Sequence, residues 1–149
     1  MVGDGQTGSP TLRKTDDYEA VKSLALRSGL EDGTFENVVT AYGYYIGNDL
    51  MGCAALKQEG GRYAVEWLAV SEDLRRKGVG RMLVAAVEAE ARMRGAERIW
   101  ALARAPRFFE GIGFRVTTSG ESGEPMMSNC MLCSQYQRSC FPAIVVKDL

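Results

Sequence analysis

An apolar strand, a short basic loop and the start of a long helix follow one another in Trp67-Leu68-Ala69-Val70-Ser71-Glu72-Asp73-Leu74-Arg75-Arg76-Lys77-Gly78-Val79-Gly80-Arg81. The first turn of a helix has unpaired N–H groups at the positive end of its dipole, so it attracts phosphate. Gly78 and Gly80 carry no side chain where a pyrophosphate would approach the backbone. Positive charge is supplied by Arg75, Arg76, Lys77 and Arg81. The stretch therefore predicts a pyrophosphate-binding loop in an α/β domain.

Two other kinds of phosphate-binding loop do not fit this stretch. A Walker loop ends in Gly-Lys-Ser/Thr, whereas residues 80–82 are Gly-Arg-Met. A dinucleotide-binding fingerprint has a third glycine three residues after the second, and Leu83 occupies that position. The alternative that stays open is a glycine-containing loop that binds no ligand.

The residues after Gly78 have the spacing of an amphipathic helix. An apolar stripe at i, i+3, i+7, i+10 and i+14 is formed by Val79, Met82, Ala86, Ala89 and Met93, and is widened by Leu83 and Val87. We expect the opposite face to carry Arg81, Glu88 and Arg92, of which the last two make a favourable i, i+4 pair. Gly95 is placed to end the helix.

The rest of the chain predicts strands and two shorter helices. Runs of β-branched and aromatic residues bounded by turn residues indicate strands. The expected strands are 12–14, 38–46, 50–57, 63–70, 99–103, 114–117 and 143–146. A helix capped by Asp16-Asp17 should run to about Ser28, and Pro106 should start a short one. Tight turns make an antiparallel meander of the strands between 38 and 70, so the fold class is α/β, of the α+β kind.

The gross composition restricts the class of protein. A length of 149 residues fits one domain, 11–149, after a Gly-rich polar tail at 1–10. The net charge of −1, from 18 basic and 19 acidic residues, argues against duplex nucleic acid as a partner. No apolar run reaches the ~20 residues of a membrane span, and the N-terminus does not have the pattern of a signal peptide. We therefore expect a cytoplasmic protein without membrane attachment.

Two segments resemble the GNAT superfamily of N-acetyltransferases. Arg75-x-x-Gly78-x-Gly80 after a Leu-Ala-Val strand is similar to its signature loop. Phe108-Phe109-Glu110-Gly111-Ile112-Gly113-Phe114 is similar to its aromatic–aromatic–x3–Gly–Phe segment. The segments follow in the expected order and at about the expected distance. The resemblance implies a mixed central sheet of about six to seven strands, flanked by helices, that splays between strands 63–70 and 99–103.

The resemblance also implies acetyl-CoA as the co-substrate, with no metal required. Edge groups of Leu68 and Val70 would pair with the pantetheine amides, and loop amides from Arg76 to Arg81 would hold the pyrophosphate. The residues assigned to the coenzyme are Leu68, Ala69, Val70, Arg75, Arg76, Lys77, Gly78, Val79, Gly80, Arg81, Phe108 and Phe109.

The implied reaction is transfer of the acetyl group to a primary amine by direct attack within a ternary complex. Leu68-Ala69-Val70, the break at residues 95–97 and Phe108-Phe109-Glu110 most resemble single-domain relatives of N-acetylglutamate synthase. That favours a small-molecule acceptor, the α-amine of an amino acid such as glutamate. Other classes stay open: an acyl-CoA-binding sensor without turnover, an acetyltransferase of a protein N-terminus or lysine, and a metal-binding module. A homodimer is one option for the assembly.

The catalytic groups depart from the pattern of the superfamily. The chain has no His, so a carboxylate, an amine, a thiolate or water must act as base. Many relatives place a Glu where Ala64 stands, and Glu66 lies two residues further, on the same face of the strand. We predict Glu66 as the base, with an ordinary solvent-facing strand residue as the alternative. The usual acid is a Tyr at the position of Phe109, which leaves water or Tyr136.

Three cysteines gather near the C-terminus, at Cys130, Cys133 and Cys140. Cys-x-x-Cys spacing suits zinc, redox chemistry or buried thiols. A closed zinc site needs four ligands, whereas this segment has three and Cys53 lies in a distant strand. We expect packed, reduced thiols in a lid over the acceptor site, formed by residues 126–140.

Overall fold

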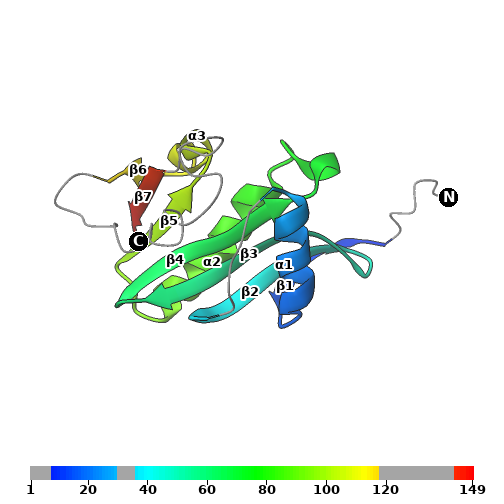
Figure 1. Cartoon of the computed structure of the whole chain (residues 1–149), viewed down its shortest axis with the longest axis horizontal. Coiled ribbons are helices and arrows are strands. Elements are labelled where there is room, and N and C mark those ends of the chain that lie inside the picture. The colour runs from blue at the N-terminus through cyan, green and yellow to red at the C-terminus, as the bar shows by residue number, and fades with distance from the viewer. Residues whose placement is uncertain (1–7, 30–35, 118–142) are drawn as a thin grey trace.

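The computed structural model describes residues 8–29, 36–117 and 143–149, which form a seven-stranded sheet flanked by helices (Figure 1). The strands are β1 (Pro10–Thr15), β2 (Val38–Ile46), β3 (Asp49–Glu59), β4 (Arg62–Val70), β5 (Arg98–Ala103), β6 (Arg115–Val116) and β7 (Ala143–Asp148). The helices are α1 (Tyr18–Arg27), η1 (Glu72–Leu74, a 3-10 turn), α2 (Val79–Met93) and α3 (Pro106–Glu110). None of the helices in these ranges has the length and apolar character that a bilayer span requires.

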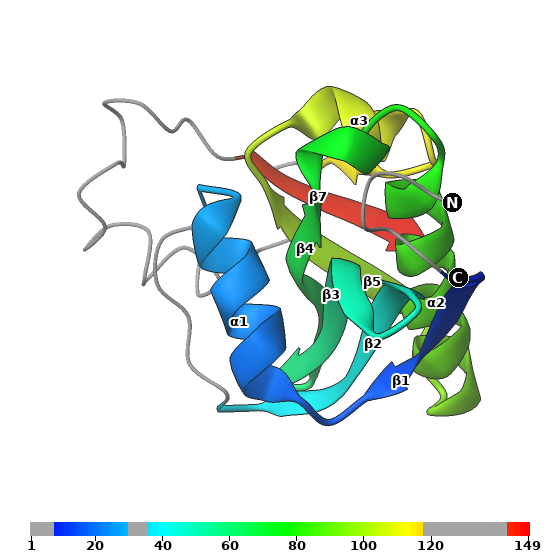
Figure 2. The same ribbon diagram turned by 90° about the vertical axis from the view of Figure 1, so that its right-hand side faces the viewer.

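The sheet has the order β1-β2-β3-β4-β5-β7-β6. Neighbouring strands are antiparallel except β4 and β5, which are parallel. The mixed sheet and the meander of β2, β3 and β4 are therefore confirmed. Helix α1 covers one face of the sheet and α2 covers the other (Figure 2).

Helix α1 begins where the sequence predicts. The Asp17 carboxylate caps it by accepting a hydrogen bond from the Ala20 N–H at 3.1 Å. Its buried residues Val21, Leu24 and Ala25 pack on β3 and β4 against Cys53 and Trp67. We refer to this group, with Ala41, Ala55 and Ala69, as the α1 cluster.

Helix α2 has the predicted bounds, and the predicted buried face is confirmed at Val79, Leu83 and Val87 but wrong at three other positions. Met82 and Met93 are 43% and 81% exposed, and Ala89 is exposed as well. The line that packs on the sheet is Val79, Leu83, Val87 and Ala91, at intervals of four residues. Glu88 was expected on the opposite face and is instead 6% exposed.

Ionic partners explain why a carboxylate is tolerated on the buried side of α2. The Lys147 ammonium of β7 lies 3.1 Å from the Glu88 carboxylate and also donates to the Ile112 carbonyl at 2.9 Å. Glu90, also 6% exposed, pairs with Lys14 at 3.0 Å and with Arg94 at 2.8 Å. A buried charge is retained only when it is paired in this way. Arg94 is an i, i+4 partner of Glu90, but Lys14 and Lys147 cannot be read from the helical spacing because they belong to strands β1 and β7.

The predicted splay between β4 and β5 is confirmed. The two strands pair at only two positions, Ala64 with Trp100 and Val65 with Ala101. From Glu66 to Val70, β4 pairs with β3 on one side and does not pair with β5 on the other. The sheet thus opens at the end of β4 that leads into the basic loop.

Candidate functional site

The loop that joins β4 to α2 ends on a left-handed glycine. Gly78 is the N-cap of α2, with φ of +83°, and it offers no side chain to cap the helix. A Cβ built on it would meet no atom within 4 Å. The space on the Cβ side of Gly78 is therefore open, and the N–H groups of the first turn have no partner within the helix, as an anion-binding helix start requires.

The four basic residues of this segment divide into two pairs. Arg75 donates from Nε to the Val70 carbonyl at 3.2 Å, and Arg81 donates to the Gly111 carbonyl at 3.3 Å. Arg76 and Lys77 are exposed. Arg75 therefore attaches the loop to β4, and Arg81 attaches the start of α2 to the end of α3. Arg76 and Lys77 carry their charge into solvent beside Gly78.

The structure gives a packing reason for the absence of a side chain at Gly80. A Cβ at this position would lie 3.1 Å from the Phe108 ring, so the glycine lets α3 pack on the start of α2. The rings of Phe108 and Phe109 pack edge to face with their centroids 5.2 Å apart, and those of Phe109 and Phe114 do so at 5.1 Å. The two predicted motifs therefore contact one another directly through Gly80 and Phe108.

Strand β4 contains a bulge at the point where it leaves β5. Cys53 of β3 pairs with Ala69 and Ala55 pairs with Glu66, so two residues of β4 oppose one of β3. Trp67, inside the bulge, has φ of +52°, which is unusual for a bulky residue. The bulge places Leu68 against the α2 core and Trp67 in the α1 cluster.

The predicted base lies at the mouth of this opening. Glu66 follows the last residue of β4 that pairs with β5. Its side chain is 35% exposed and lies 3.4 Å from the Lys57 ammonium, which also lies 3.7 Å from Glu59. The carboxylate is therefore accessible and has its charge balanced by a neighbour that sequence reasoning did not identify.

Phe109 stands at the position of the usual acid and was assigned to the coenzyme. It is 7% exposed and packs in the core. Tyr136 and the three C-terminal cysteines lie outside the described residues. Within the described ranges, no three His, Cys, Asp or Glu side chains are grouped as ligands of one metal ion.

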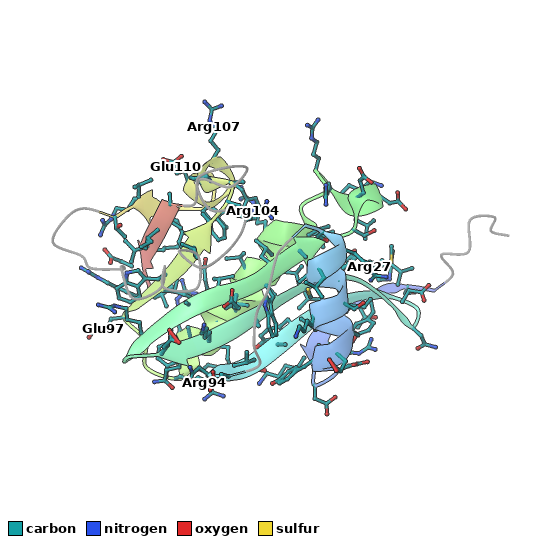
Figure 3. The ribbon with its side chains drawn as sticks, viewed as in Figure 1. Arg27, Arg94, Glu97, Arg104, Arg107 and Glu110 are labelled. Atoms are coloured by element: carbon teal, nitrogen blue, oxygen red, sulfur yellow. The ribbon has the colours of Figure 1, made fainter. Side chains whose placement is uncertain are left out.

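Two further groups near the opening were missed by sequence reasoning. The Arg104 guanidinium, at the end of β5, donates to the Gly29 carbonyl just after α1 and so links the two halves of the sheet on the α1 side (Figure 3). The Cys53 thiol donates to the Trp67 carbonyl in the bulge at 3.3 Å. Neither contact has a local sequence signal, because each joins residues that are far apart in the chain.

A groove of about 710 Å³ opens between α1, the β2–β3 turn and the residues that follow β4. Its walls carry the cations Arg27 and Arg75 together with three carboxylates. Ser71 and Arg75 connect it with the basic loop, but Glu66 and the residues of β5 do not line it. The groove therefore adjoins the loop and lies apart from the opening between β4 and β5.

The family of the chain follows from a match over most of its length. The acetyltransferase (GNAT) family matches residues 11–114, so the chain belongs to that family. No curated protein sequence matches it.

Several solved structures share the fold. N-acetylglutamate synthase from Neisseria gonorrhoeae, complexed with coenzyme A and N-acetyl-glutamate, is 22% identical with a TM-score of 0.75; the match covers 95% of this chain and 35% of that one. The chain thus spans about a third of that enzyme's length. A Mycobacterium tuberculosis protein in complex with CoA and NLQ is 18% identical with a TM-score of 0.70, covering 93% and 99%. A GNAT-family acetyltransferase from Staphylococcus aureus Mu50 is 13% identical with a TM-score of 0.69, covering 95% and 99%.

Proposed function

We propose that the chain binds acetyl-CoA with its pyrophosphate at the first turn of α2. The observation that carries the proposal is Gly78, the N-cap of α2, which has a left-handed backbone and no capping side chain, and which follows the end of β4 that no longer pairs with β5. Backbone amides from Arg76 to Arg81 would hold the phosphates, with Arg76 and Lys77 adding charge. The pantetheine would lie in the opening, against the edge of β4 at Leu68, Ala69 and Val70. The structures of two relatives that hold coenzyme A support this placement.

The proposed reaction is acetyl transfer to a primary amine. The neutral amine attacks the thioester carbonyl, a C–N bond forms, the C–S bond breaks, and the thiolate leaves as coenzyme A. Glu66 takes the proton that the attacking nitrogen loses, directly or through water. The thiolate is reprotonated by water or by Tyr136, because Phe109 has no proton to donate.

We propose the α-amine of an amino acid such as glutamate as the acceptor. The support is the fold shared with N-acetylglutamate synthase and the segment similarities at residues 68–70 and 108–110. An acyl-CoA sensor without turnover is the second candidate, and it is favoured by one observation. Phe109 stands where the usual acid would be and is packed in the core.

Release of free coenzyme A thiol, measured across amino acids, polyamines and peptides, tests the proposal. We expect turnover with an amino acid and slow hydrolysis of acetyl-CoA without an acceptor. Faster turnover with peptides or polyamines would overturn the proposed acceptor class. Tight acetyl-CoA binding in calorimetry with no turnover on any amine would overturn catalysis and establish the sensor.

A further inference from the structure

The bulge in β4 has a backbone conformation that its own sequence does not favour. Trp67 has φ of +52°, in the left-handed region that glycine and asparagine adopt far more readily than a large aromatic residue. Such a conformation persists only where the surroundings hold it. The bulge also interrupts the regular hydrogen bonding between β3 and β4, so the peptide groups within it need other partners.

The Cys53 thiol supplies such a partner from the neighbouring strand. Its Sγ lies 3.3 Å from the Trp67 carbonyl oxygen and, more distantly, 3.8 Å from the Val21 carbonyl oxygen of α1. The side chain has no exposed surface. Burial raises the pKa of Cys53 to about 12, and a hydrogen bond with the Ala69 backbone opposes that rise. The thiol therefore stays protonated and remains a donor throughout the neutral range.

Fixing the Trp67 carbonyl also fixes the direction of the next amide. The peptide bond between Trp67 and Leu68 is trans, so its C=O and N–H point in opposite directions. Because the carbonyl points at Cys53, under α1, the Leu68 N–H points away from that thiol. Leu68 is one of the residues of β4 that do not pair with β5.

We propose that Cys53 is a positioning residue for coenzyme binding: its thiol holds the bulge peptide so that the Leu68 N–H is presented to acetyl-CoA. The inference rests on the proposed function only in that acetyl-CoA must bind along β4. This positioning role requires a hydrogen-bond donor at residue 53, whereas a residue that only fills space would not.

Calorimetric titration with acetyl-CoA, at a temperature where every variant is folded, tests this role. Cys53→Ala and Cys53→Val both remove the donor, one leaving a void and the other filling the space with apolar groups. We expect each to weaken acetyl-CoA binding about three- to tenfold, the effect of one lost hydrogen bond. Cys53→Ser keeps a donor and should bind within about twofold of wild type.

Val21→Ala is the matched control. It removes two methyl groups from the same cluster and leaves the Val21 backbone carbonyl in place. We expect it to lower stability and to leave acetyl-CoA affinity unchanged. Wild-type affinity in Cys53→Ala or in Cys53→Val, or an equal loss in Val21→Ala, would overturn the positioning role. Absence of binding by the wild-type protein would instead overturn the proposed function itself, and this inference with it.

Discussion

Glu66 stands where β4 and β5 part, and its neighbour Lys57 balances its charge without covering it. If this carboxylate takes the proton from the amine, Glu66→Gln should lower kcat by roughly 100-fold, since general base catalysis contributes on that order. Acetyl-CoA affinity should change little, because the coenzyme amides would pair with other residues of β4 in the proposed complex. The acid limb of the pH–rate profile should also move or vanish.

Glu59→Gln is the matched control for that change. Glu59 approaches the same Lys57 ammonium, at 3.7 Å, but lies at the far end of β3. Its replacement should leave kcat and the pH–rate profile as in the wild type. An unaltered rate in Glu66→Gln would make Glu66 a surface residue and leave the substrate to enter as the free amine.

At the scale of single residues, a sequence pattern can single out a residue without showing which contacts that residue makes. The pattern predicts Gly78 and Gly80 as phosphate-binding glycines. The structure adds that a Cβ on Gly78 would meet open space and that Gly80 makes room for the Phe108 ring. Cys53 was considered only as a distant fourth ligand for a zinc site, because its contact with Trp67 depends on a bulge that no local pattern shows.

At the scale of elements, α2 shows how long-range ion pairs change the face that a helix buries. Glu90 lies among Lys14 of β1, Tyr42 of β2 and Arg94. The hydrogen bond from Lys14 is the main cause that lowers the pKa of Glu90, burial opposes it, and hydrogen bonds from Arg94 and Tyr42 add to the lowering. Helix α2 is thereby attached to the strands at the β1 edge of the sheet.

This attachment should make the stability of the protein depend on pH. The pKa of Glu90 in the folded state is below its ordinary value of 4.5, so the ionised carboxylate stabilises the fold above that pH. The contribution is lost as the pH falls through the folded-state pKa. Glu90→Gln should therefore lower the free energy of unfolding by about 1–3 kcal/mol near neutrality, and the difference from wild type should shrink in acid.

Urea unfolding at a series of pH values, from neutral to strongly acidic, measures this difference. Glu97→Gln serves as the control, because Glu97 is exposed just beyond the end of α2 (Figure 3). It should unfold like the wild type at every pH. A Glu90→Gln variant whose deficit stays constant from neutral to acid pH would contradict the assigned role of the ionised carboxylate.

At the scale of the whole molecule, most of the architecture was predictable because the strand and helix patterns are local. The bounds of β2 and α2 agree with the patterns at residues 38–46 and 79–93. The splay was implied by the family resemblance and is confirmed by the short register of β4 with β5. The links across the two halves of the sheet were not predictable, since Arg104 with Gly29 and Lys147 with Glu88 join residues remote in sequence.

The most direct test of the account compares acetyl-CoA binding by two glycine variants in calorimetry. Gly78 and Gly95 flank the two ends of α2, with φ of +83° and +87°, and a Cβ at either would meet no atom within 4 Å. Gly78→Val and Gly95→Val therefore impose similar backbone strain, but only the first places a side chain over the helix start. We predict that Gly78→Val loses acetyl-CoA binding and that Gly95→Val retains it. Unchanged affinity in Gly78→Val would contradict the assignment of this loop to the pyrophosphate.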